Sequence, residues 1–275
     1  MKNPSLFGLT IAIALAFSSC QKEADSPTLP SGGKLTLQLD NVVGQASAAN
    51  GTTYTPLVLD AGTYRNANGD DFTVTTFKYY LSNLTLYKAD GSRYAVPDSY
   101  FLVDQAKEDS RRFTLSEVPT GDYTSLSFVV GVDSLRTKAG NFTGVLNADN
   151  GMFWDMNGPE FINLKLEGRS PQSPTTALVF HVAGYKGQAN NTIRTVTTPF
   201  PSTLLVRADR SPRLRLQADA ARLFTGPNPA TTAPAPFLNP VSFATVYNRM
   251  SGPSVAKLAD NVAAGMFSVT EVQAN

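Results

Sequence analysis

The chain has 275 residues, of which 42% are hydrophobic and only 16% are charged, and 23 basic against 22 acidic residues leave a formal charge of +1. This length is sufficient for one large domain with a sizeable core. The balanced charge, without a clustered basic face, argues against nucleic-acid binding. Twenty glycines, 18 prolines and 10% aromatic residues are typical of an extracytoplasmic all-β protein rather than a helical one.

The N-terminus predicts a lipoprotein signal over residues 1–19. Lys2 precedes an apolar run, Leu6–Phe17, which is too short to cross a bilayer of about 30 Å as a helix but suits a signal sequence. The following residues, Ala16–Cys20, resemble a bacterial lipobox. We therefore expect cleavage before Cys20, lipid attachment to its thiol and anchoring to the membrane through that lipid. The alternative is an ordinary secretory signal followed by an unmodified cysteine.

Residues 20–33 are polar and contain Pro and Gly, which predicts a flexible tether. Its charged cluster Lys22–Asp25 resembles the export tag that sends some Bacteroidetes lipoproteins to the cell surface. These features predict an outer-membrane lipoprotein that faces the periplasm or the cell surface. Residues 34–275 contain no repeat and no break in composition, so we expect one domain.

Short runs of strand-like sequence dominate the first half of that domain. Asn68-Gly69 predicts a hairpin turn, Gly44–Thr53 a loop, and Ser82-Asn83 a bulge. Residues 135–151 lack periodicity and predict a long excursion. The expected strands are Lys34–Leu39, Leu57–Leu59, Phe72–Thr75, Phe77–Lys88, Tyr100–Asp104, Arg112–Leu115 and Thr124–Gly131.

The second half of the domain also consists of short strand-like runs, and it contains the only stretches with helical spacing. Val241–Met250 and Val255–Gly265 predict one or two short C-terminal helices. The expected strands are Phe161–Leu166, Ala177–Val182, Ser202–Ala208, the start of Arg213–Phe224, and Phe267–Val269. Strands separated by Gly, Pro and Asn turns predict an all-β sandwich with Greek-key-like, immunoglobulin- or transthyretin-type layers and long loops.

The rare residues of the chain cluster in one stretch. Trp154 is the only tryptophan and His181 the only histidine, and Met156 lies two positions after Trp154. If the strands around 161–166 and 177–182 pair, these residues can meet at one end of a sheet, because positions 154 and 156 of an extended segment share a face. Imidazole and thioether ligands select Cu(I). Core packing explains the same residues equally well, since methionine commonly fills gaps beside aromatic rings.

A series of short motifs in this order resembles the MbnP-like copper-binding family, whose members include relatives of the methanotroph copper proteins MopE and CorA and many Bacteroidetes lipoproteins. The motifs, from about residue 34 to the C-terminus, are Lys78–Asn83, Pro119–Tyr123, Gly131–Ser134, Gly151–Trp154, Leu164–Gly168, Phe180–Val182, Leu258–Asn261 and Met266-Phe267.

The resemblance implies a β-sandwich that binds copper outside the cytoplasm. In this family a tryptophan is oxidised to kynurenine and joins histidines at the metal; Trp154 and His181 stand at two of these positions. The oxidation implies a di-haem peroxidase-like partner. This chain has Met156 where copper-binding members have a second histidine, and Asn41 where many have another.

Two functions therefore remain open from the sequence. The first is copper binding through a reduced site of His181, Met156 and Trp154. The second is a metal-free structural or partner-binding surface module that has lost the copper ligands. An enzyme is not expected, because a Gly-x-Ser-x-Gly motif and glycine-rich phosphate loops are absent from the sequence. Asp133 and Glu167 can be interpreted as an acid/base pair, but hydrogen bonding to loop backbone explains such residues better.

Overall fold

The structure is a computed structural model that describes residues 32–47, 51–155, 158–225 and 240–274. The predicted signal segment, Cys20, most of the tether and Met156 lie outside the described residues. Within the described residues, no helix is long and apolar enough to cross a membrane.

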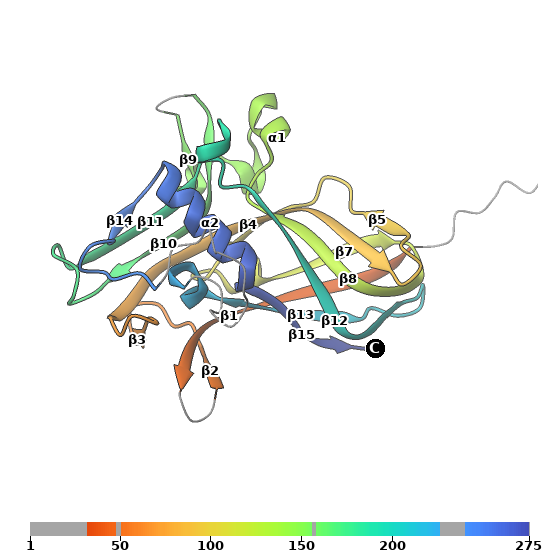
Figure 1. Cartoon of the computed structure of the whole chain (residues 1–275). Helices are drawn as coiled ribbons and strands as arrows, with labels where there is room; N and C mark the ends of the chain where they lie inside the picture. The colour runs from red at the N-terminus through yellow and green to blue at the C-terminus, as the bar shows by residue number, and fades with distance from the viewer. Residues whose placement is uncertain (1–31, 48–50, 156–157, 226–239, 275) are drawn as a thin grey trace, which may run out of the picture.

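Two β-sheets form the body of the protein and confirm the all-β sandwich (Figure 1). The smaller sheet has the order β15-β13-β1-β2, with β7 also on β1, and only β1 and β13 run parallel. Its strands are β1 (Gly33–Ser47), β2 (Gly51–Pro56), β7 (Arg112–Val118), β13 (Arg213–Asp219) and β15 (Phe267–Gln273).

The larger sheet is built on the 18-residue strand β4. One edge of β4 pairs first with β10 and then with β8, while β6 and β5 follow the other edge. Strand β12 pairs with β8, and β11 joins β10 to β14. The strands are β3 (Tyr64–Arg65), β4 (Asp71–Lys88), β5 (Arg93–Ala95), β6 (Tyr100–Asp104), β8 (Gly121–Val130), β9 (Phe153–Trp154), β10 (Glu160–Arg169), β11 (Ala177–Ala183), β12 (Arg194–Val206) and β14 (Asn248–Arg249).

The predicted bulge in β4 lies within its pairing with β8, which begins at Leu81, just after the pairing with β10 ends at Tyr79. The register with β8 shifts between Ser82 and Thr85, and Asn83 has a left-handed φ of 52°. Just beyond the end of β8, Gly131 has φ 121°, and its position is so crowded that a Cβ would lie 2.5 Å from the Asn163 side chain. Asn163 accepts a hydrogen bond from the Val132 amide at 3.1 Å, which ties this turn to β10.

Two hydrophobic clusters lie on the two faces of the larger sheet. The main core is formed from both sheets and includes a group of edge-to-face aromatic rings, Phe72, Phe180, Phe224 and Phe243. A second cluster covers part of the opposite face; its buried members are Tyr80, Val132, Leu146, Met152, Phe161, Ile162 and Ala183. The segment between β8 and β10 covers this cluster.

That segment is the long excursion predicted for residues 135–151. It forms helix α1 (Ser134–Ala139) and two single 3₁₀ turns, η2 (Gly144–Leu146) and η3 (Ala148–Asn150). Asp133 is the N-cap of α1 and accepts a hydrogen bond from the Arg136 amide at 2.9 Å. Helix α1 and strand β9 lie on the same side of the molecule, away from the β1–β2 hairpin (Figure 1).

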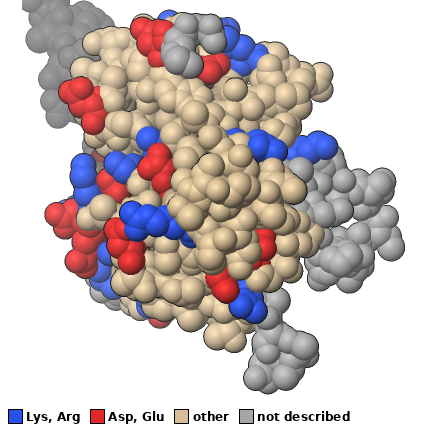
Figure 2. Space-filling view, turned by 90° about the vertical axis from the view of Figure 1, so that its left-hand side faces the viewer, with Lys and Arg blue, Asp and Glu red and all other residues tan. Residues whose placement is uncertain are grey.

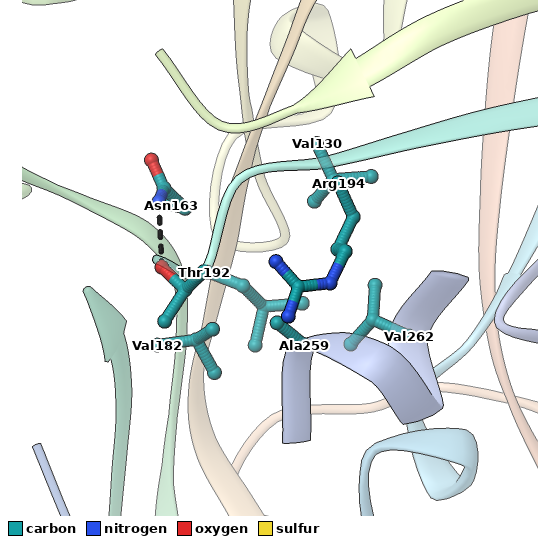
Figure 3. A pocket seen from close by; sticks show the side chains of 8 residues that line it. Val130, Asn163, Val182, Thr192, Arg194, Ala259 and Val262 are labelled. Atoms are coloured by element: carbon teal, nitrogen blue, oxygen red, sulfur yellow. Dashed lines mark hydrogen bonds between the residues drawn. The ribbon is translucent and has the colours of Figure 1, made fainter. Parts of the chain in front are cut away.

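Helix α2 (Pro253–Gly265) confirms the second of the two helices predicted near the C-terminus. It begins with proline in its first turn, where no intrahelical amide bond is lost, and buries Val255, Leu258 and Val262 against the core. Arg194 of β12 reaches across a small hollow towards this helix (Figure 3). Its guanidinium lies 2.6 Å from the Asp260 carboxylate and so fastens α2 to the larger sheet.

Several local predictions were wrong. Residues 241–250 form turns and the two-residue strand β14 instead of a helix, because Phe243 is drawn into the aromatic core and the Tyr247 carbonyl accepts from the Val179 amide. Leu57–Leu59 is not a strand, while most of the expected loop Gly44–Thr53 is strand, since β1 continues to Ser47 and pairs with β2. Strand β12 also begins earlier than expected, at Arg194.

Tyr79 and Tyr80 are adjacent on β4, so alternation along the strand turns their rings to opposite faces. Both rings are fully buried, because the second cluster covers the outer face at Tyr80.

Candidate functional site

His181 lies on β11 and faces away from the main core. Its neighbours Phe180 and Val182 belong to that core, so alternation along the strand places the imidazole on the opposite face. Its cross-strand partner on β10 is Lys165. Only 9% of the residue is exposed, so the ring is nearly removed from solvent.

Glu167 holds the imidazole by one of its two nitrogens. His181 Nε2 lies 2.7 Å from Glu167 Oε1, and Thr76 donates its hydroxyl to the other carboxylate oxygen at 3.1 Å. Glu167 is two residues after Lys165 on β10 and therefore shares its face. The Glu167 carboxylate is therefore held by side chains from both neighbouring strands, Thr76 on β4 and His181 on β11.

The pKa values of His181 and Glu167 both lie below their ordinary values. Burial lowers the pKa of His181, and the nearby Lys165 charge adds to this, although the bond to Glu167 opposes both. Burial acts to raise the pKa of Glu167, but the hydrogen bond from His181 and the Lys165 charge prevail and lower it. The pair at neutral pH is therefore a neutral imidazole that donates Nε2–H to an ionised carboxylate.

This tautomer leaves the Nδ1 lone pair of His181 free to bind a ligand. Nδ1 is buried and has no hydrogen-bond partner in the described structure. A buried polar atom without a partner is costly and requires an explanation. Metal-binding histidines commonly show the same arrangement, in which one ring nitrogen donates to a carboxylate and the other binds the ion.

Trp154 lies beside this histidine. Strand β9 pairs Trp154 with Glu160 and Phe153 with Phe161, which turns the chain back along β10. The Trp154 and His181 ring centroids are 5.7 Å apart with planes inclined by 49°. The structure thus brings together two of the three residues singled out from the sequence, while Met156, the third, lies outside the described residues.

Met152, Asp133 and Asn41 have structural roles. Met152 is fully buried in the second cluster. Asp133 caps α1 by accepting from the Arg136 amide, which is a bond to backbone, and it also accepts from the side chains of Tyr100 and Asn83. Asn41 donates to Gln105 and accepts from the Tyr79 hydroxyl, each at 2.8 Å, within a buried polar network. It is satisfied without a metal.

Sequence reasoning missed the roles of Glu167 and Lys165. The signal was their spacing: two charged residues alternate with core leucines on β10, and the next strand carries the lone histidine. The pairing register between β10 and β11 decides which charged side chain lies beside the imidazole, and the sequence alone does not determine that register. Across the residues that the structure describes, no group of three or more His, Cys, Asp or Glu side chains could hold a metal ion.

The face of the protein in Figure 2 carries its charges in small mixed groups, with Lys and Arg next to Asp and Glu, and shows no continuous basic surface. This agrees with the balanced charge of the chain.

Comparison with known families decides the relationship. The MbnP family profile matches residues 32–242, which is more than half of the chain. The chain belongs to the MbnP family. The solved structure of MbnP from Methylosinus trichosporium covers 88% of this chain and 98% of its own, with a TM-score of 0.50 and 12% sequence identity. At that identity the likeness establishes a shared fold. A comparison with curated proteins found no match.

Proposed function

We propose that this MbnP-family protein is an extracytoplasmic lipoprotein that binds a copper ion, in the Cu(I) state, at His181. The observation that supports this most is the free, buried Nδ1 lone pair of a neutral imidazole whose other nitrogen is held by Glu167. Together with membership of a family linked to copper, it favours a ligand role over simple core packing.

The donor set suits Cu(I) better than a divalent ion. His181 supplies one imidazole nitrogen, and Met156, two positions after Trp154, supplies a thioether. Soft, low-coordinate sets of this kind select Cu(I), whereas Cu(II) and Zn²⁺ sites need more nitrogen or oxygen ligands. A second histidine is absent from the whole sequence, so a multi-histidine site is excluded.

Trp154 is proposed as the third member of the site. Its ring contacts His181, so a new donor atom formed by oxidation of the indole to kynurenine would arise beside the imidazole. That oxidation needs an external oxidant, and by family analogy a di-haem peroxidase-like partner supplies it. The protein itself is proposed to bind and not to catalyse.

The proposed location follows from the N-terminus. A lipid on Cys20 anchors the protein in the outer membrane, facing the periplasm or the cell surface, and residues 21–33 hold the domain away from the bilayer.

A metal-free partner-binding module is the second candidate. It is favoured by the lack of a cluster of three or more His, Cys, Asp or Glu groups in the described parts of the chain. Under this alternative His181 only supports the Trp154 contact.

The deciding experiment is a Cu(I) titration of the mature chain against a competing chelator, beside His181→Ala. We expect tight 1:1 binding that is lost in the variant, and weaker binding by Met156→Leu. Met250→Leu is the matched control, because Met250 is exposed and lies outside the proposed site. The mass of the Trp154 peptide from native material reports on kynurenine.

The outcomes separate the two candidates. Binding that survives His181→Ala, or that falls equally in Met250→Leu, contradicts the site. Wild-type protein that does not compete with the chelator, with an unmodified Trp154, supports the partner-binding module.

A further inference from the structure

A row of charged and polar side chains crosses four strands next to the candidate site. Asp104 on β6 pairs in register with Lys78 on β4, Lys78 with Lys165 on β10, and Lys165 with His181 on β11. Directly opposite cross-strand residues share a face, so all four lie on the side of the sheet that carries the second hydrophobic cluster.

The two lysines donate to the backbone of the segment that leads to Trp154. Lys165 Nζ lies 2.6 Å from the Gly151 carbonyl oxygen, and Lys78 Nζ lies 3.4 Å from that of Asn150. Asp104 holds the Lys78 ammonium at 3.1 Å. These carbonyls come directly at the end of the η3 turn, where helical carbonyls lack intrahelical partners and attract cations.

The chain turns at this contact point, shortly before Trp154, and the next residue, Met152, accepts a hydrogen bond from the Ile162 amide of β10. Gly151 has φ 69°, so the chain changes direction there before Met152 enters the buried cluster. Strand β9 has only two residues and pairs with β10 alone. A short strand held on one side is weakly fixed by its own ladder, so the anchored turn before it matters for the position of the indole.

We propose that Lys165 and Lys78 are positioning residues, which fasten the turn at Asn150-Gly151 to the sheet and thereby place the Trp154 ring against His181. This deepens the proposed function, because those two rings form the proposed site, but it requires no metal. The lysines act through the backbone and are not proposed as ligands.

The test uses the mature full-length chain in detergent with excess chelator, so that copper plays no part. Because the protein has one tryptophan, acrylamide quenching of fluorescence excited where tyrosine does not absorb reports on Trp154 alone. Because it has one histidine, isotope-labelled histidine gives the ring signal of His181 alone. In Lys165→Met we expect the quenching constant to rise about twofold as the indole gains solvent access. The His181 ring signal should lose the shift caused by the neighbouring indole.

Lys88→Met is the matched control, because Lys88 lies at the far end of β4 over the Tyr123 ring. It removes the same charge and should change neither signal. Lys165→Arg, which keeps a donor, should retain most of the wild-type values. If Lys165→Met does not fold, Lys165→Gln, which is too short to reach the Gly151 carbonyl, replaces it.

Unchanged quenching and an unchanged His181 signal in folded Lys165→Met and in the double variant with Lys78→Met would overturn the proposal. An equal effect of Lys88→Met would do the same, since it would indicate a general consequence of charge loss. Neither result bears on whether wild-type protein binds Cu(I), which the chelator titration measures separately.

Discussion

At the scale of single residues, Glu167 determines the chemical state of its neighbour His181. The lone histidine is a common core residue until a carboxylate takes one ring nitrogen and leaves the other buried without a partner. Glu167 thus decides which nitrogen is available, although it is not proposed as a ligand itself.

Glu167→Gln should lower the Cu(I) affinity about tenfold, because carboxylates that orient a ligating imidazole typically contribute this much. The variant keeps the size of the side chain and an acceptor oxygen but loses the charge. Glu271→Gln, on the other sheet and paired with Arg215, is the control and should leave affinity unchanged. The measurement is the same chelator competition. Equal affinities for wild type and Glu167→Gln would show that the imidazole needs no carboxylate.

Asp133 gives a prediction of pH dependence. Burial acts to raise its pKa, but donation from the Tyr100 hydroxyl, the Arg136 amide and Asn83 outweighs burial, so the pKa lies below the ordinary value. Its contribution to stability is therefore present above the pKa of the unfolded chain and is lost as the pH falls through the folded pKa.

Asp133→Asn should accordingly be less stable than wild type at pH 7, by about 1 kcal/mol. The difference should shrink on acidification below about pH 4, the usual carboxyl range. Urea unfolding at both pH values measures this. Asp122→Asn is the control, since that carboxylate forms a surface pair with Arg207 and should matter little. A deficit that stays constant with pH would contradict the assignment.

At the scale of elements, Gly168 explains why the motif Leu164–Gly168 ends in glycine. The register between β10 and β4 shifts at Glu167-Gly168, and there the backbones approach so closely that a Cβ would lie 2.1 Å from the Thr73 carbonyl oxygen. A side chain at this position must push β4 and β10 apart, and Glu167 is the adjacent residue.

Gly168→Ala should cost about 1–3 kcal/mol of unfolding free energy, the usual range for forcing extra volume into a packed site. It should also loosen the Glu167–His181 contact. Gly265→Ala at the end of α2 is the control, because its Cβ would meet only ordinary contacts with Arg222. Urea unfolding compares the two variants. Similar urea midpoints for Gly168→Ala and Gly265→Ala would contradict this prediction, because β4 and β10 would then accommodate the extra methyl group without loss of stability.

At the scale of the whole molecule, the two sheets share one core. Residues from β1, β4, β13, β15, the 3₁₀ turn Ala220–Phe224 and α2 belong to the same buried cluster, and the second cluster packs on strands of the same larger sheet. We therefore expect one cooperative unfolding transition.

Trp154 fluorescence reports on the second cluster, and far-ultraviolet circular dichroism reports on the strands. Because we expect one cooperative transition, the urea unfolding curves followed by these two signals should coincide. An earlier tryptophan transition would show that the excursion around η3 and β9 unfolds as a separate unit.

The sequence by itself determined the features that depend on neighbouring residues. The strand-like runs Lys34–Leu39 and Phe77–Lys88, the Asn68-Gly69 turn and the Ser82-Asn83 bulge are local patterns, and all were found. Local pattern also identified helix α2 and the family motifs. The same reasoning failed at residues 241–250. Their spacing is helical, but Phe243 packs into the aromatic core against residues distant in the sequence, and the segment does not form a helix.

Only the tertiary structure decided what surrounds the rare residues. Trp154 and His181 are 27 positions apart, and strand pairing brings their rings into contact. The pairing register places Lys165 opposite His181, and packing turns the imidazole towards Glu167. A slip of one residue would move every one of these side chains to the other face of the sheet. The sequence therefore named the site residues, and the register and packing set their chemistry.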